Sequence, residues 1–135
     1  MHENIRNGEY AQLRFAMRAL ELDYTISIPT IPARYDYVLD DGTKLSRIQV
    51  KYCNSQASHS VGAVHLKLIK RGHRNCPTVY TKTDIDALVV YLPATDKLHM
   101  LPVKLFDGRQ AITIRYQAPK NSQTKKIILA EDYIW

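Results

Sequence analysis

The sequence contains few cysteines, and their surroundings form no recognisable zinc motif. Cys53 and Cys76 are the only two in 135 residues, and neither belongs to a CxxC pair. His59, His65 and His73 lie between them, so a zinc site can be imagined, but this spacing fits no common zinc-binding pattern. We therefore expect two unrelated thiols that are at least partly buried.

Long apolar runs are absent as well. No stretch approaches the roughly 20 residues that a membrane-spanning helix needs, and the opening MHENIRNGEYAQ has no apolar segment of the signal-peptide type. These absences predict an intracellular, cytoplasmic protein without a membrane partner. A length of 135 residues and a hydrophobic content of 45% suffice for a real core and predict a single domain, residues 1–135.

Acidic residues are missing from two long segments, residues 42–83 and 108–130. The cations of these segments are Lys44, Arg47, Lys51, Lys67, Lys70, Arg71, Arg74 and Lys82 in the first, and Arg109, Arg115, Lys120, Lys125 and Lys126 in the second. The whole chain carries a formal charge of only +6, so charge is separated along the sequence. Two solvated basic faces are one interpretation. Single-sign fields of this kind attract polyanions, however, and we favour a nucleic acid as the partner.

Hydrophobic periodicity predicts one N-terminal helix over residues 5–22. The side chains at helical spacing are Leu13, Ala16, Met17 and Leu20. We expect this stripe to face inward, and Glu9 extends it towards the N-terminus.

Most of the remaining chain is predicted to form strands. The segments with strand-like patterns are 24–29, 34–53 as a hairpin, 61–70, 85–93, 97–103 and 111–116. Residues 85–93 are an apolar run of the kind that is buried on both faces of a sheet. Short helices fit only near 77–84 and 103–106. The sequence therefore predicts an α/β domain with the N-terminal helix packed on a mixed central β-sheet.

The hairpin RYDYVLDDGTKLSRIQVKYC, residues 34–53, places polar side chains where they can meet. Side chains alternate along a strand, so Gln49 and Lys51 share one face. A two-residue turn at Asp41-Gly42 puts Arg47 opposite Asp36 and Gln49 on the diagonal, whereas a four-residue loop puts Gln49 directly opposite. In both registers, Asp36, Gln49 and Lys51 can line one patch.

These residue types suit metal-assisted phosphodiester hydrolysis. Mg²⁺ prefers oxygen ligands and keeps some waters, so Asp36 is the expected main ligand, Glu9 assists directly or through water, and Gln49 offers a neutral oxygen. Glu9 joins them if the helix packs on this side. Lys51 can orient the attacking water and offset charge that develops in the transition state.

Each residue also has an ordinary structural interpretation. Asp36 could cap a turn or pair with Arg47, and Lys51 could be a strand-end lysine in water. Glu9 could simply favour the helix N-terminus, where acids interact well with the helix dipole. The order of all four residues along the chain is harder to explain in this way.

That order resembles the motif of the PD-(D/E)XK nucleases, which is a helix Glu, a strand Asp and then (D/E)-x-K. Over roughly residues 8–103, the segments GEY, SIP, RYDYVLDDG, RIQVK and VVYLPATDKLHMLPV resemble a narrower group that includes the cyanobacterial group I intron homing endonuclease. The resemblance implies active-site roles for Glu9, Asp36, Gln49 and Lys51, and a divalent cofactor, Mg²⁺ or another such as Mn²⁺. Gln49 replaces the second acid, so the number of bound metals stays open. Tyr35 replaces the motif proline, which changes little chemically.

The expected activity is therefore site-specific cleavage of double-stranded DNA by a homo-oligomer, either a dimer or a tetramer. The expected DNA contacts are Lys67, Lys70, Arg71, His73, Arg74, Lys120, Lys125 and Lys126. A resolvase that cuts Holliday junctions and a non-catalytic DNA-binding domain are the alternatives. A small-molecule enzyme is less favoured, because the sequence has no Gly-rich phosphate loop and no Ser or Cys nucleophile motif.

Overall fold

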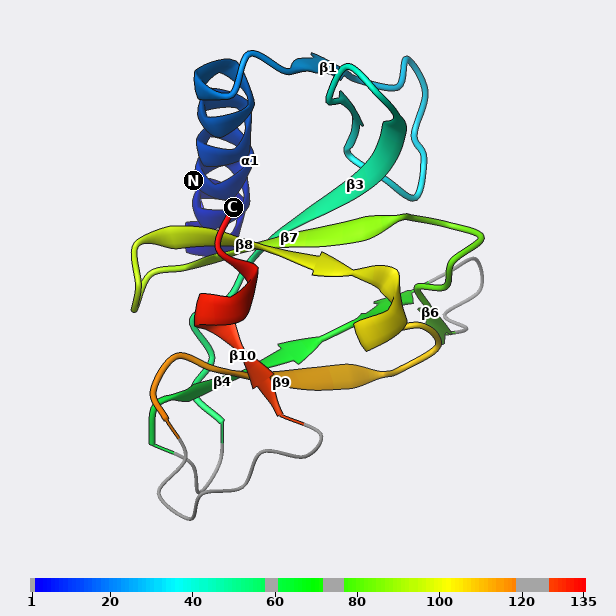
Figure 1. The fold of residues 1–135 in the computed structure, drawn as a ribbon. Coiled ribbons are helices and arrows are strands. Elements are labelled where there is room, and N and C mark those ends of the chain that lie inside the picture. Colours follow the sequence, from blue (N-terminus) through cyan, green and yellow to red (C-terminus); the bar gives the residue numbers. More distant parts are fainter. Residues whose placement is uncertain (1, 58–60, 72–76, 119–126) are drawn as a thin grey trace.

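Three layers make up the computed structural model, which describes residues 2–57, 61–71, 77–118 and 127–135. Helix α1, Glu3–Glu21, is the first layer. A five-stranded sheet is the second and a three-stranded sheet the third, and Figure 1 shows β4, β9 and β10 of the third layer below β7 and β8 of the second. Within the described ranges, no helix is long and apolar enough to cross a membrane.

The central sheet has the strand order β1-β2-β3-β7-β8. Its strands are β1 Thr25–Ser27, β2 Tyr37–Asp40, β3 Leu45–Tyr52, β7 Ala87–Leu92 and β8 Lys97–Pro102. Strands β3 and β7 are parallel and the other pairs are antiparallel, so the sheet is mixed, as predicted. Every residue of β7 is buried, which confirms the prediction for this apolar run.

The third layer contains strands from the second half of the chain. It has the order β10-β9-β4, with β4 Ala63–Lys67, β9 Ala111–Arg115 and β10 Ile128–Leu129. The remaining elements are the hairpin strands β5 Ile69–Arg71 and β6 Pro77–Val79, and the 3-10 helices η2 Val103–Leu105 and η3 Ala130–Tyr133. Helix η2 matches the short helix expected near 103–106, whereas β6 and turns occupy 77–84.

Helix α1 turns a different face to the sheet from the one predicted. Its buried residues are Ala11, Phe15 and Ala19. The expected inward stripe is largely exposed, with exposed fractions of 64% for Leu13, 57% for Met17 and 75% for Leu20. Both stripes repeat every three to four residues, so periodicity alone did not separate them. The alanines lack bulk and let the helix approach the sheet closely, and this favours their face.

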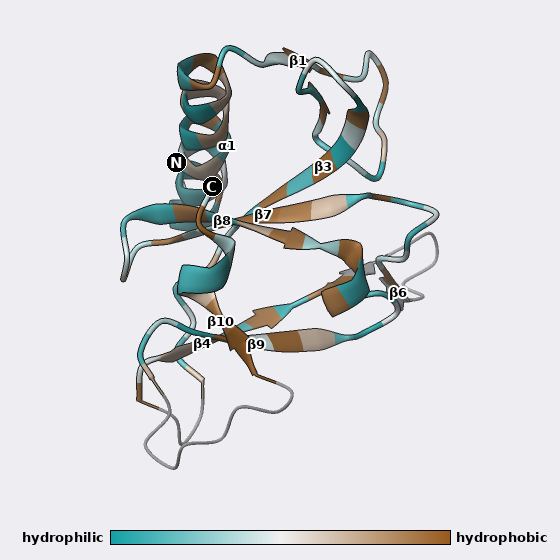
Figure 2. Ribbon diagram, in the orientation of Figure 1, coloured by the Kyte–Doolittle hydropathy of each residue, from teal (hydrophilic) through white to brown (hydrophobic). Residues whose placement is uncertain are grey.

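Two hydrophobic clusters hold the layers together. The cluster between α1 and the central sheet contains Phe15, Ile48 and Val50. The cluster between the two sheets contains Leu88 and Val90 of β7 with apolar residues of β4, β9 and β10. Figure 2 shows hydrophobic colour along β7, β9 and β10, where these clusters lie.

The C-terminal segment docks on the core of its own chain. Ile128 pairs with Ile114 in a parallel bridge, and the ring of Trp135 stacks on Phe15 with centroids 5.1 Å apart. The Trp135 backbone N–H also donates to the Leu98 carbonyl at 3.0 Å. The six large apolar residues near this end of the sequence are therefore explained at least in part by intramolecular packing.

Candidate active site

The turn of the β2–β3 hairpin sets the register of the candidate site. Asp40 pairs with Leu45 and Tyr37 with Ile48, so the loop has four residues, 41–44. The Asp41 carboxylate accepts hydrogen bonds from the Thr43 hydroxyl at 2.7 Å and from the backbone N–H groups of Thr43 and Lys44 at 2.9 Å. These bonds, led by the hydroxyl, lower the pKa of Asp41 to about 2. Of the two registers considered, the structure has the one with Gln49 opposite Asp36.

Asp36 is attached to β3 by its backbone and by its side chain. Its N–H donates to the Ile48 carbonyl at 2.8 Å, and its Oδ2 accepts a hydrogen bond from the Val50 N–H at 2.9 Å. The two bonds flank Gln49 on both sides along the strand. They fix the carboxylate beside the face that carries Gln49 and Lys51.

Lys51 lies over an aromatic ring that sequence reasoning missed. Its Nζ is 5.5 Å from the centroid of the Tyr80 ring, and the Arg34 guanidinium is 5.4 Å from the same centroid. Burial raises the pKa of Tyr80, and the charge of Asp36 raises it further. Asp36, Lys51 and Arg34 therefore gather around this ring. A single tyrosine within the segment 77–84 gives no sequence signal for such a role.

The sheet face of Gln49 and Lys51 is the one turned away from α1. Gln49 pairs in register with Leu88 and Lys51 with Val90, and these partners belong to the cluster between the two sheets. Helix α1 instead covers Ile48 on the opposite face. We expected Glu9 to join the site if α1 packed on the face of Gln49 and Lys51. The helix packs on the other face, so it does not bring Glu9 to these residues in that way.

Glu9 is exposed on α1 but lies within electrostatic reach of the hairpin. The Tyr37 hydroxyl donates to Gln12 Oε1 at 3.3 Å, one helical turn after Glu9. Burial raises the pKa of Tyr37, and the charges of Asp36 and then Glu9 raise it further. Both carboxylates therefore act on the pKa of one tyrosine.

The donor set fits an open, water-rich magnesium site better than a closed metal centre. No group of three or more His, Cys, Asp or Glu side chains that could hold a metal occurs in the described parts of the chain. Mg²⁺ typically needs only one or two carboxylates beside waters and substrate phosphates. The Asp36 carboxylate retains lone pairs after accepting the Val50 bond, and Gln49, opposite Asp36, carries a further oxygen, whereas Glu9 lies on α1, which covers the other face of the sheet.

Other cations of the acid-free segment have mixed roles. Arg47 lies opposite Val38, and its guanidinium pairs with Asp86 at 3.0 Å, which is a structural role. Lys67 is exposed at the end of β4. Lys70 and Arg71 lie in β5, but their side chains are outside the described set, as are residues His73, Arg74, Lys120, Lys125 and Lys126.

A hollow of about 370 Å³ opens beside Lys51. Its lining consists of Lys51, Tyr52, Cys53, Ser55, His65, Leu66 and Lys67. Cys53 is buried, as expected, and burial raises the pKa of its thiol. The hollow brings Lys51 and Lys67, two of the predicted functional lysines, to one opening between the sheets.

Comparisons with known proteins show solved structures with a similar fold. The bacterial homing endonuclease I-Ssp6803I has a similar structure, with a TM-score of 0.75 and 23% identity over 98% of this chain and 89% of that one. Hjc, a Holliday junction resolvase from Archaeoglobus fulgidus, has a TM-score of 0.50 and 11% identity over 80% of this chain and 83% of that one. A search of the curated proteins gives no match.

The sequence profile described as PD-(D/E)XK endonuclease matches residues 2–135. This match covers the helix, the hairpin with Asp36 and Lys51, and both sheets. The chain therefore belongs to the PD-(D/E)XK endonuclease family.

Proposed function

We propose that the protein is a site-specific endonuclease of the homing type that hydrolyses phosphodiester bonds of double-stranded DNA with Mg²⁺ or another divalent cation. The observation that carries the proposal is the carboxylate of Asp36, held by Val50 on β3 beside Gln49 and Lys51. The fold shared with I-Ssp6803I supports the same type of activity.

Four side chains carry the chemistry in this proposal. Asp36 is the principal metal ligand, Glu9 acts directly or through water, and Gln49 adds a neutral oxygen. The bound cation supplies Lewis acidity and makes a coordinated water more acidic. Lys51 orients the attacking water and offsets negative charge in the transition state, and the ring of Tyr80 supports its ammonium group.

We also propose that the working form is a homo-oligomer, at least a dimer. Each chain offers one Asp36–Lys51 site, and cutting both strands in one encounter needs two. A twofold axis matched to the pseudo-symmetry of duplex DNA is the simplest way to supply them. Light scattering of the protein alone and on DNA tests this part, and a strict monomer of 15.5 kDa in both states contradicts it.

The activity is tested with a supercoiled plasmid library of candidate sites, a plain duplex and a four-way junction, each with and without Mg²⁺. The proposal predicts metal-dependent linearisation of plasmids that carry one site and no preference for the junction. Preferential cutting of the junction would instead identify a resolvase. Binding without cutting of any substrate would identify a non-catalytic DNA-binding domain.

A further inference from the structure

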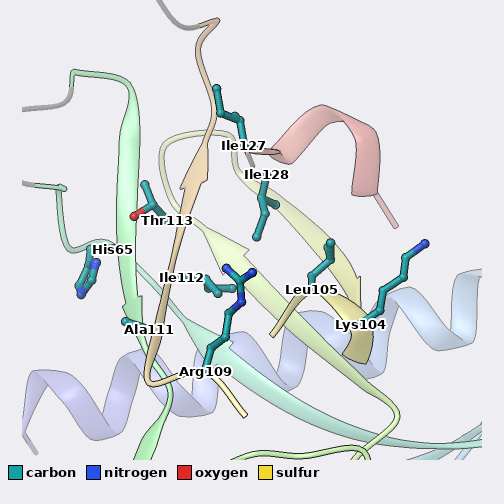
Figure 3. A pocket seen from close by; sticks show the side chains of 9 residues that line it. All are labelled: His65, Lys104, Leu105, Arg109, Ala111, Ile112, Thr113, Ile127 and Ile128. Carbon is teal, nitrogen blue, oxygen red and sulfur yellow. The ribbon is translucent and has the colours of Figure 1, made fainter. Parts of the chain in front are cut away.

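A second hollow, of about 350 Å³, lies against β9. Figure 3 shows the residues that line it: His65, Lys104, Leu105, Arg109, Ala111, Ile112, Thr113, Ile127 and Ile128. Arg109 reaches along the hollow towards Ile112 and Leu105, and Lys104 extends from η2 at its margin. The hollow therefore has an apolar floor and cationic groups at its border.

His65 connects this hollow with the one beside Lys51. It lines both hollows, and it pairs in register with Thr113 across β4 and β9. Lys67, two residues further along β4, pairs in register with Ala111, which also lines the second hollow. The two hollows are thus adjacent openings along the β4–β9 strand pair, which we call the ribbon, and Lys51 of the candidate active site lines one of them.

The lining of these two hollows differs in charge from that of two other hollows in the described part of the chain. Neither of the two hollows that share His65 is lined by an acid. In contrast, the hollow under the 28–33 loop contains Asp36, and the one beside the C-terminal half of α1 contains Glu21 and Asp96. A polyanion therefore meets no repelling carboxylate in the lining of the two connected hollows.

The two cations of the second hollow, Arg109 and Lys104, also differ from most described arginines in having no carboxylate partner among the described residues. The arginines that pair with a carboxylate are Arg14, Arg18, Arg34 and Arg47. Among the described residues, no carboxylate pairs with Arg109 or Lys104. Asp107, the acid nearest to them in sequence, accepts a hydrogen bond from the Lys82 N–H at 3.0 Å. No described carboxylate therefore competes with an external anion for Arg109 and Lys104.

We propose that the hollow formed by Arg109, Lys104 and Thr113 binds the phosphodiester backbone of DNA, on a path that leads from Lys51 past His65. The inference rests on the proposed function and extends it, because Arg109, Lys104, Thr113 and His65 do not belong to the catalytic set. Phosphate contacts fix the position and register of a duplex but carry no sequence information directly. Arg109 and Lys104 are thus positioning residues that hold DNA flanking the cut.

The test compares DNA binding by the full chain with binding by the double variant Arg109→Ala/Lys104→Ala. Fluorescence anisotropy with a labelled duplex is measured without divalent metal, between about 50 and 200 mM KCl. Because each phosphate contact contributes about one unit to the salt slope of log K, we expect the slope to become shallower by about two. Affinity at the lower salt should fall about tenfold.

A matched control removes the same charges elsewhere. The variant Arg6→Ala/Lys97→Ala loses one exposed arginine and one exposed lysine from α1 and β8. We expect its salt slope to stay within about half a unit of the wild-type slope, because these positions lie away from the ribbon. Thermal unfolding of all three proteins verifies that the exposed substitutions leave the fold intact.

The outcomes separate this inference from the proposed function. If the wild type cleaves duplex DNA but the Arg109/Lys104 variant binds with the wild-type slope and affinity, the hollow is not part of the DNA path, and the nuclease proposal stands. If the salt slope of log K is shallower in the variant while neither protein cleaves any substrate, the proposed DNA path is supported and the nuclease proposal fails. At saturating DNA, the variant should retain the wild-type cleavage rate, which a catalytic role for Arg109 would not allow.

Discussion

Lys51 and His99 lie in one row across the central sheet, on the same face, with Val90 between them. His99 is only 1% exposed. Its Nδ1 is 2.7 Å from the Ala130 carbonyl oxygen, and its Nε2 is 3.0 Å from Thr95 Oγ1. Lys51 is half-buried and lines an opening. One face of one sheet is thus a closed core at β8 and an open site at β3.

The two ends contrast a polar residue whose side chain is enclosed by its own chain with the polar residues that we propose to be functional. At the closed end, each ring nitrogen of His99 has a partner, the Ala130 carbonyl at the start of η3 and the Thr95 hydroxyl in the turn before β8. At the open end, the Asp36 carboxylate is held on β3 next to Gln49, and Lys51 lines a hollow between the sheets. We therefore expect substitutions at the closed end to change stability, and substitutions at the open end to change cleavage.

The largest effect on stability is expected from removing a buried side chain at the closed end. Leu101 is fully buried on this face, so Leu101→Ala should lower the free energy of unfolding by about 2–5 kcal/mol. Leu45, in β3, is 68% exposed, and Leu45→Ala should stay within about 0.5 kcal/mol of the wild type. Urea denaturation measures both. Equal losses from the two substitutions would contradict the assigned burial.

At the open end, two substitutions of Asp36 separate its structural role from its chemical one. Asp36→Asn keeps an oxygen that can accept the Val50 hydrogen bond but removes the charge. We expect a cleavage rate lowered at least about 100-fold with little change in stability. Asp36→Ala also leaves the buried Val50 N–H without this partner and should cost a further 1–3 kcal/mol of stability, roughly. An active Asp36→Asn enzyme would remove Asp36 from the metal site.

A smaller effect is expected where the closed and open regions meet, at Tyr80. Its ring is 2% exposed and supports the ammonium of Lys51. Tyr80→Phe keeps the ring face and should cleave at nearly the wild-type rate. Tyr80→Leu removes an interaction of about 0.5–1 kcal/mol, so cleavage per folded molecule should fall several-fold. Equal rates for the two variants would show that the ring does not support Lys51.

The smallest expected effect is the contribution of His99, at the closed end, to the pH dependence of stability. Burial holds the pKa of His99 below its ordinary value of 6.5, and the charge of Lys97 lowers it further. The unfolded chain therefore takes up this proton more readily, so the contribution of His99 is complete above about pH 6.5 and is lost as the pH falls below it. His99→Gln removes the titration. Urea unfolding across this range should show a weaker pH dependence in the variant than in the wild type.

The sequence was sufficient to predict the elements that form the site but not the way α1 packs. The hairpin, the buried strand β7 and the order of Asp36, Gln49 and Lys51 follow from alternation and turn residues that act locally. The four-residue loop could not be chosen in advance, because the hydrogen bonds of the Asp41 side chain decide it.

The orientation of α1 and the role of Tyr80 depend on contacts between distant segments. Leucines at helical spacing usually mark a buried face, but here Ala11 and Ala19 allow close approach and Phe15 fills the space beside Tyr37. Tyr80 comes under Lys51 only because the chain returns to β3 through the segment before β7. Neither contact has a local pattern in the sequence.

The most direct test of the account compares Lys51→Ala with Lys44→Ala in cleavage and in DNA binding. Both variants lose one lysine from the same hairpin, but Lys44 lies in its exposed loop. Lys51→Ala should cleave at least about 100-fold more slowly while its affinity for DNA stays near that of Lys44→Ala, because the role of Lys51 is in the transition state. Cleavage by Lys51→Ala at the wild-type rate would contradict the assignment of the open end of this sheet as the active site.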